Sequence, residues 1–352
     1  MSTYILKRAG QAVLVLWAAY TLSFLLLNAL PGDAVSNRIQ NPEAQLSPES
    51  AQALIAYYGL DRPLVVQYFS GLGSVLHGDL GFSLTNGTTV GSLLAQALPS
   101  TLQLTGLALV FGLIFAALLA TGANYAPWKP VRELLGAIPA LFGSVPTFVV
   151  GILALQFLSF ELGLIPSTDD GTFLALLAPA VTLAIFITAP LAQVLAISIA
   201  TTRDLPFVHV LRARGAGEGY SFRRGVLRNS SLPVLTLLGL VCGELIAGSV
   251  VTEAVFARSG IGQVTVNAVG TQDLPVLQGV VLIAASAFVV VNFVVDIAYP
   301  FLDPRILVAT GRTRRAGAGL RAPAKTLLGD SRLDGIGAVS VGRGLPAEVS
   351  MP

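Results

Sequence analysis

Six long, continuously apolar runs dominate the sequence and limit the folds that it can adopt. Each run has about 20 residues or more, the length that a helix needs to cross roughly 30 Å of hydrocarbon. Because polar and apolar residues do not alternate within them, the runs predict membrane-spanning helices rather than the strands of a barrel. The expected spans are residues 9–30, 99–122, 133–159, 173–200, 232–256 and 276–302.

The composition indicates that lipid is the solvent for most of this chain. Only 11% of its 352 residues are charged and 54% are hydrophobic, whereas about 25% of the residues of a soluble domain are charged. The net charge of +2 is too small to indicate a nucleic-acid partner. The first run is too long for a signal peptide and lacks a good cleavage site at Ala29-Leu30-Pro31, so we expect it to be retained.

The distribution of lysine and arginine predicts the orientation. With the N-terminus inside, the loop at 201–231 holds six arginines on the inner side, and only Arg38, Arg62 and Arg258 fall outside. Short loops rich in Lys and Arg stay in the cytoplasm. We therefore expect six spans with both termini cytoplasmic.

The sequence divides into four parts. The N-terminal segment and first span occupy residues 1–30, and an extracytoplasmic cap with several turn signals occupies 31–98. The spanning core extends over 99–307. Residues 308–352 are rich in Gly, Ala, Ser and Arg without an apolar period, which predicts a disordered cytoplasmic tail.

The loop at 201–231 is longer than a connection needs to be. Its residues Leu205 to Arg214 predict a short helix, with Pro206 in the first turn and Gly215 as its end. Phe207, Val210 and Leu211 recur at helical spacing, and His209, Arg212 and Gly215 form a second stripe. This pattern predicts a short amphipathic helix parallel to the membrane.

At this loop the chain resembles the permease family of bacterial ABC importers, in its oligopeptide and dipeptide branch. The resemblance extends to Leu307. Three residues depart from the family pattern: His209 stands where the branch usually has Arg, Leu211 stands where Ala is usual, and Ser259 stands where Pro is usual. The matching motifs are Phe207 to Gly215, Arg223-Arg224, Leu227-Arg228-Asn229, Leu232-Pro233-Val234-Leu235, Leu30-Pro31-Gly32-Asp33, Tyr58 to Pro63, His77 to Ser83, Gly163 to Pro166, Gly248 to Glu253, Ser259 to Gln263, Asp273 to Gly279 and Asp303 to Ile306.

The resemblance implies an all-α, six-helix ABC importer permease fold with an extracytoplasmic insertion after the first helix, in a bacterial inner membrane. It implies a second permease subunit, an extracytoplasmic binding protein that delivers cargo, and two ATPase subunits that bind ATP and Mg²⁺ and receive the 201–231 loop. It implies peptide cargo, with nickel or another small solute as the alternative. The residues that it assigns to coupling with the ATPase are Phe207, His209, Arg212, Ala213, Arg214 and Gly215.

Several residues within the spans are candidates for the translocation pathway. Glu244 and Asp296 are ionisable groups inside apolar runs, where such groups are costly and often functional. For Asp296 we favour a contact with a neighbouring helix near the cytoplasmic end. Among the prolines that kink spans, Pro146 and Pro190 are pathway candidates beside Glu244, although simple packing geometry explains most such prolines.

Enzymatic function is not indicated by any motif. Phosphate-binding, nucleophile-elbow and zinc signatures are absent from the sequence, and we expect no cofactor, catalytic residue or metal site in this chain. His77 and His209 fall on opposite sides of the expected membrane, and Cys242 stands alone. A secondary transporter would show inverted repeats that we do not find, and an intramembrane enzyme would need more than Glu244 and Asp296.

Overall fold

The computed structural model describes residues 2–29, 47, 49, 52, 53, 56 and 62–302, and in this part of the chain nearly all residues are helical. The predictions for Asp33, for Tyr58 to Asp61, for the Asp296 side chain and for the 308–352 tail lie outside the described residues. The helices are α1 Ser2–Ala29, α4 Leu64–Leu76, α5 Val90–Tyr125, α6 Lys129–Ser144, α7 Thr147–Ala154, η2 Leu155–Glu161 (a π-helical segment), α8 Phe173–Arg203, α9 Pro206–Ala213, α10 Glu218–Ser221, η3 Phe222–Val226 (also π-helical), α11 Leu227–Val255, α12 Ile261–Gly270 and α13 Leu274–Leu302.

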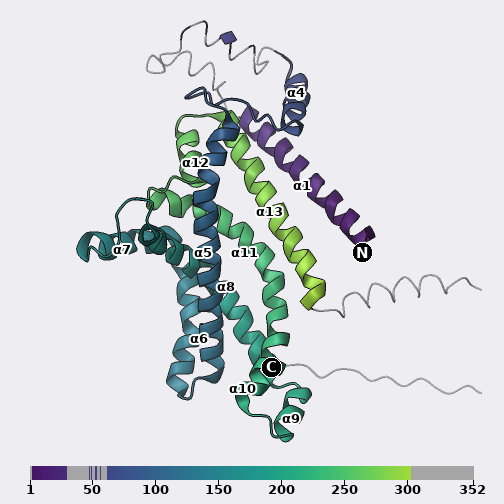
Figure 1. Ribbon diagram of the computed structural model, residues 1–352, viewed down its shortest axis with the longest axis vertical. Helices are drawn as coiled ribbons and strands as arrows, with labels where there is room; N and C mark the ends of the chain where they lie inside the picture. The colour runs from purple at the N-terminus through teal and green to yellow at the C-terminus, as the bar shows by residue number, and fades with distance from the viewer. Residues whose placement is uncertain are drawn as a thin grey trace, which may run out of the picture. The chain divides into compact units, whose positions relative to one another are not determined.

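Five of the six predicted spans are helices long and apolar enough to cross a membrane: those in α1, α5, α8, α11 and α13. The sixth predicted span, over 133–159, is not a single straight helix. The structure has α6 and the α7–η2 arm, bent by 99° at a short break, and these make a sixth span if the bent pair is taken as one. Figure 1 shows α7 leaving the direction of α6 sideways.

Pro146 is the physical reason for this bend. It precedes α7, and Val145 before it has the extended backbone (φ −103°, ψ 125°) that proline imposes on its predecessor. Pro139, seven residues earlier, remains inside α6, and Pro179 and Pro190 remain inside α8, so these prolines do not end their helices.

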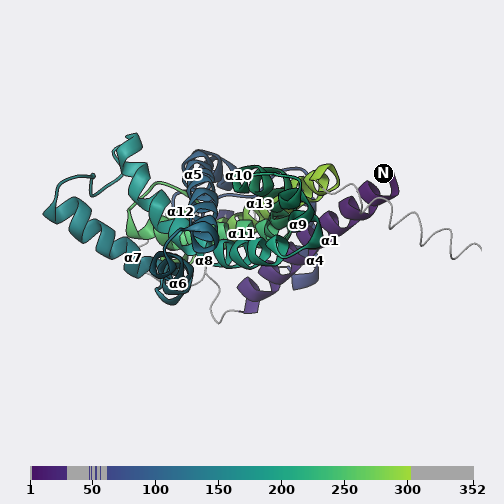
Figure 2. The same ribbon diagram turned by 90° about the horizontal axis from the view of Figure 1, so that it is seen from below.

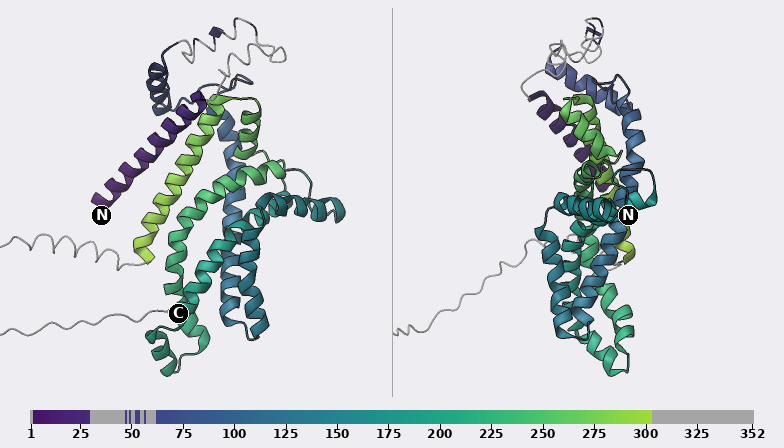
Figure 3. Two further views of the ribbon diagram at one scale, coloured as in Figure 1. Left: turned by 180° about the vertical axis from the view of Figure 1, so that it is seen from behind. Right: turned by 90° about the vertical axis from the view of Figure 1, so that its left-hand side faces the viewer.

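The core is centred on α8. In the most apolar stretch of α8, 61% of the residues are buried, whereas in that of α1 only 11% are buried. Small residues let α5 approach α8 closely, because a Cβ on Gly112 would overlap the side chain of Ile187. Leu104, Leu183 and Leu191 are fully buried in the same cluster. Helix α1 packs on α13 at the edge of the bundle (Figure 3).

The two ends of the bundle carry different elements. Helices α9 and α10 lie at one end, here called the hairpin end, and α4 and α12 lie at the other, here called the cap end (Figure 1). Seen from below, α7 projects from one side of the bundle while α1 and α4 lie on the opposite side (Figure 2).

Candidate functional site

The 201–231 loop forms a helical hairpin between α8 and α11. The predicted short helix is present as α9, which begins at Pro206 after the extended residue Leu205. Proline suits this position because the first N–H of a helix has no partner within the helix. Helix α10 and the π-helical η3 then lead the chain back into α11.

Gly215 ends α9 through its backbone conformation. Its φ is +83°, and its N–H donates to the carbonyl of Arg212 at 2.9 Å, while the N–H of Ala216 donates to that of Leu211 at 3.1 Å. These two bonds are the Schellman motif, which favours glycine at this position. A Cβ on Gly215 would meet no atom of this chain within 4 Å, so the constraint within the chain is the positive φ rather than crowding.

The two faces of α9 have different roles. Val208 is fully buried in the main core cluster, and a Cβ on Gly225 would lie 3.2 Å from Leu211 and 3.4 Å from Phe207, so this face packs on η3. The opposite face presents the exposed residues Pro206, His209, Val210, Ala213 and Arg214. Four of the predicted coupling residues, His209, Ala213, Arg214 and Gly215, are therefore exposed, and Phe207 is partly so.

Arg212 stands three residues after His209 and four after Val208, so it lies at the border between the exposed and packed faces of α9. The Arg212 side chain is 34% exposed and pairs with Glu218 of α10, with 3.7 Å between Nη2 and Oε1. Within this chain it joins α9 to α10.

An aromatic contact links the hairpin to the spans. The Arg203 guanidinium lies 4.3 Å from the centre of the Tyr125 ring, and Tyr125 meets Phe222 of η3 edge to face, with 5.1 Å between ring centroids. Arg203 also donates to the carbonyl of Asn124. The ends of α5 and α8 are thus joined to η3 by a cation–π contact and an aromatic contact.

The pathway candidates lie on three different elements. Glu244 is half-buried in α11, Pro190 is half-buried in the middle of α8, and Pro146 is exposed at the bend before α7.

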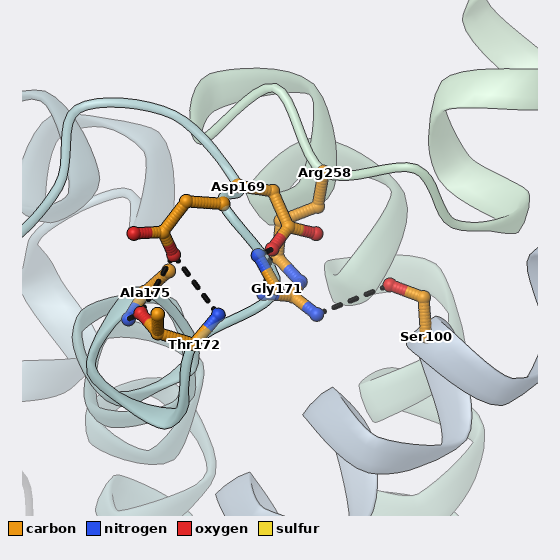
Figure 4. Close-up of polar contacts among 7 residues, drawn as sticks. Ser100, Asp169, Gly171, Thr172, Ala175 and Arg258 are labelled. Atoms are coloured by element: carbon orange, nitrogen blue, oxygen red, sulfur yellow. Dashed lines mark hydrogen bonds and ion pairs between the residues drawn. The ribbon is translucent and has the colours of Figure 1, made fainter.

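At the cap end, a buried ion pair joins two loops that are far apart in the sequence. Arg258, which follows α11, is buried, and its Nη1 lies 3.4 Å from Oδ1 of Asp169 in the loop before α8. Its Nη2 donates to the Ser100 hydroxyl of α5 at 3.1 Å. Figure 4 shows the Arg258 guanidinium between these two groups. The predicted outer loops at 160–172 and 257–275 are thus held together on α5.

The same loop begins α8 with hydrogen bonds of its own. The Asp170 carboxylate accepts the Thr172 hydroxyl at 2.6 Å and the Thr172 N–H at 2.9 Å, which lowers the pKa of Asp170 below its usual value. The Thr172 oxygen in turn accepts the N–H of Ala175 at 3.3 Å, which caps the helix (Figure 4).

Glu253 is the fully buried carboxylate of this end. Its Oε2 accepts the N–H of Gly262 at 2.6 Å, and a Cβ on Gly260 would overlap the carboxylate. The Thr101 hydroxyl accepts the N–H of Ile261 at 2.8 Å. The Gly260-Ile261-Gly262 sequence therefore lets the start of α12 lie directly on Glu253 and α5.

Asp273 anchors the end of the predicted cap segment. It is buried before α13 and accepts the Ser83 hydroxyl at 2.5 Å, the Leu84 N–H at 3.2 Å and the Thr85 N–H at 3.1 Å. A loop more than 180 residues away in the chain is thereby fixed to the start of α13.

Sequence reasoning missed two of these groups. It weighed Glu244 but passed over Glu253, which the neighbouring Gly-Ile-Gly motif and Arg258 could have indicated. It also missed Tyr125 as the contact of Arg203. Among the described residues no group of three or more His, Cys, Asp or Glu side chains could hold a metal ion, and His77 and His209 lie at opposite ends of the bundle.

The chain is similar to known transport proteins along most of its length. Residues 108–308 match the family described as "Binding-protein-dependent transport system inner membrane component". The dipeptide transport system permease protein DppB of Lactococcus lactis subsp. cremoris is 32% identical over 308 residues, which cover 87% of this chain and 99% of that relative. The glutathione transport system permease protein GsiC of Escherichia coli K12 is 32% identical over 310 residues, with the same coverage of both chains.

Solved structures show the fold. A chain of the inward-facing MetNI methionine ABC transporter superposes with a TM-score of 0.50 at 17% identity, covering 60% of this chain and 96% of that chain. Together with the apolar helices, this likeness confirms the predicted fold class, an all-α membrane protein with an ABC importer permease fold.

Proposed function

The chain belongs to the family of binding-protein-dependent transport system inner membrane components, and from this we propose that it forms half of the pathway of an ATP-driven peptide importer. The observation that carries the proposal is the 32% identity over 87% of the chain to permeases of dipeptides and of glutathione. Family membership makes the chain a multi-pass membrane protein and a transport component rather than an enzyme, in agreement with the sequence.

The hairpin is the surface that we assign to the ATPase subunits. Its exposed face combines Val210 and the partly exposed Phe207 with the charged Arg214, while Val208 fixes the helix to the core. An exposed apolar patch with a charged rim is suited to a protein partner. The contact of Tyr125 with Phe222 supports this assignment, because it offers a route from the hairpin to α5.

A second permease subunit accounts for the α7–η2 arm. Phe148, Ile152, Leu153, Phe157 and Phe160 on this arm are exposed, and the arm extends sideways from the bundle (Figure 2). A partner permease facing α7 and η2 would cover these side chains and enclose the pathway with them. Pro146 would then be a hinge of that pathway, and Glu244 and Pro190 remain its candidate lining residues.

The cap end is the surface that we assign to the binding protein. The links of Arg258 to Asp169 and of Asp273 to Ser83 join the outer loops to the spans, so that a protein docking there would act on α5, α8 and α13 together. The hairpin end is then cytoplasmic, with both termini on that side of a bacterial inner membrane, as the arginine distribution favours.

The cargo that we propose is a short peptide, and the relatives do not favour nickel as an alternative. Purification of the tagged chain from its native membrane should recover a second permease, ATPase subunits and ATPase activity stimulated by the binding protein. Vesicles containing that complex should accumulate labelled dipeptide only with binding protein outside and ATP and Mg²⁺ inside. Uptake driven by an ion gradient without ATP would refute the proposal, and uptake of Ni²⁺ alone would refute the peptide cargo.

A further inference from the structure

Helix α4 is an apolar helix outside the span bundle, and it has no buried residue. Its 13 residues, Leu64–Leu76, include no Asp, Glu, Lys or Arg. A helix of this kind needs an environment for its apolar side chains, since it is too short to cross a bilayer by itself.

The side chains of α4 divide into two opposite stripes. Val65, Phe69, Leu72 and Leu76 form an apolar stripe, and Gln67, Ser70 and Ser74 form a polar stripe. At 100° per residue the centres of the two stripes lie roughly 160° apart around the helix. Val65, Phe69 and Leu76 are 66%, 64% and 78% exposed, so most of the apolar stripe is uncovered in this chain.

A third side of α4, between the two stripes, packs on α1. The Tyr20 hydroxyl donates to the carbonyl of Tyr68 at 3.0 Å, and the Tyr68 hydroxyl and Thr21 Oγ1 are 2.8 Å apart. The Tyr68 ring also meets Phe24, with 5.4 Å between ring centroids. A Cβ on Gly71 would lie 2.7 Å from the Tyr20 hydroxyl, so glycine permits this close approach.

The position of this contact along α1 places α4 at the depth of the lipid boundary. The apolar span of α1 is Arg8–Leu27, and Tyr20 lies seven residues before its outer end, or about 10 Å at 1.5 Å per residue. Amphipathic helices at membrane surfaces bury their apolar face by about 5–10 Å. The exposed Leu22, Leu25 and Leu26 of α1 lie near the same depth, on the side of α1 that is turned away from α4.

We propose that α4 is an interfacial helix, with its apolar stripe in the acyl chains of the outer leaflet and its polar stripe toward water. Lipid fits this surface better than a protein partner because the stripe is uncharged throughout and lies at the depth of the apolar span of α1, whose exposed leucines at that depth also need an apolar environment. The placement in the outer leaflet rests on the proposed orientation. Such a helix fixes the first span and the cap segment at one depth in the membrane.

Spin labels can test this placement in the full complex reconstituted into lipid nanodiscs. A Cys242→Ala background removes the single native cysteine, and Val65→Cys and Phe69→Cys then label the apolar stripe. Ser70→Cys and Ser74→Cys, both at exposed positions, provide matched controls on the polar stripe. Collision of each label with oxygen, which dissolves in lipid, is compared with collision with a water-soluble nickel chelate.

We expect labels at 65 and 69 to collide more with oxygen than with the chelate, at a depth of about 5–10 Å, and labels at 70 and 74 to show the reverse preference. Labels at 65 and 69 that are shielded from both reagents would overturn the proposal in favour of a protein partner. Equal access of the chelate to all four positions would overturn it in favour of a solvated helix. Neither reading depends on transport, so failure here is distinguishable from failure of the proposed function.

Discussion

The backbone of Gly215 gives a prediction whose magnitude follows from the structure. Its φ of +83° is a conformation in which any side chain with a Cβ is strained, although the space around it is open. A left-handed residue other than glycine costs about 1–2 kcal/mol, which lowers the population of the native helix end by a factor of about 5 to 30. We expect Gly215→Ala to reduce the uptake of cargo per ATP hydrolysed, Gly215→Val to reduce it further, and Gly215→Asn to have the smallest effect because Asn tolerates this conformation.

Gly217 provides the matched control, two residues away. It has φ −64° and ψ 161°, and a Cβ there would also meet no atom within 4 Å. Gly217→Ala should therefore keep the ratio of uptake to ATP hydrolysis, measured in vesicles, together with normal membrane insertion. Full activity of both Gly215→Ala and Gly217→Ala would refute the reasoning from backbone strain. Equal loss of activity in both would instead indicate that a partner subunit crowds this loop.

The remaining predictions concern the links described above and the tail. Arg258→Ala should strongly lower the thermal unfolding midpoint of the purified subunit, because breaking a buried ion pair costs about 3–5 kcal/mol. The double variant Arg258→Met with Asp169→Leu should recover part of that loss. A double variant without recovery would contradict the role of charge. Asp273→Asn should speed proteolysis of the loop at 79–89 while the bundle stays folded. Tyr125→Leu should lower the free energy of unfolding by about 1 kcal/mol, because the aromatic contact is lost, and should also lower coupled uptake. Tyr125→Phe should preserve both stability and uptake. Removal of residues 308–352 should leave uptake unchanged, and loss of assembly would show that the tail is a docking element.

The sequence predicted the features that depend on local pattern. Five spans and the short helix before Gly215 follow from apolar runs and from the residues that begin and end helices. Proline predicted a kink in the third span but not its place, because Pro139 and Pro146 carry the same signal and only Pro146 ends a helix. After the bend, α7 packs closely on the end of α11, where a Cβ on Gly151 would lie 3.1 Å from Val255 and 3.2 Å from Phe256.

Side-chain partners from distant segments were also beyond the sequence. The pairing of Arg258 with Asp169 joins residues 89 positions apart, and the clustering of Asp273 with Ser83 spans 190 positions. The pairing of Arg212 with Glu218 of α10 was likewise not predicted. In each case the missing information was which segments the fold brings together.

The bend at Pro146 has a consequence for the biosynthesis of the chain. Helix α6 has 16 residues and reaches only about 24 Å, less than the roughly 30 Å of hydrocarbon. A translocon that releases helices one at a time into lipid would therefore release a segment that does not cross the membrane as one continuous helix. The backbone N–H and C=O groups at the break would find no hydrogen-bond partners in lipid. Folding of the third span is thus tied to the arrival of later segments and of a neighbouring subunit, and a chain synthesised in excess over its partner should be a substrate for membrane proteases.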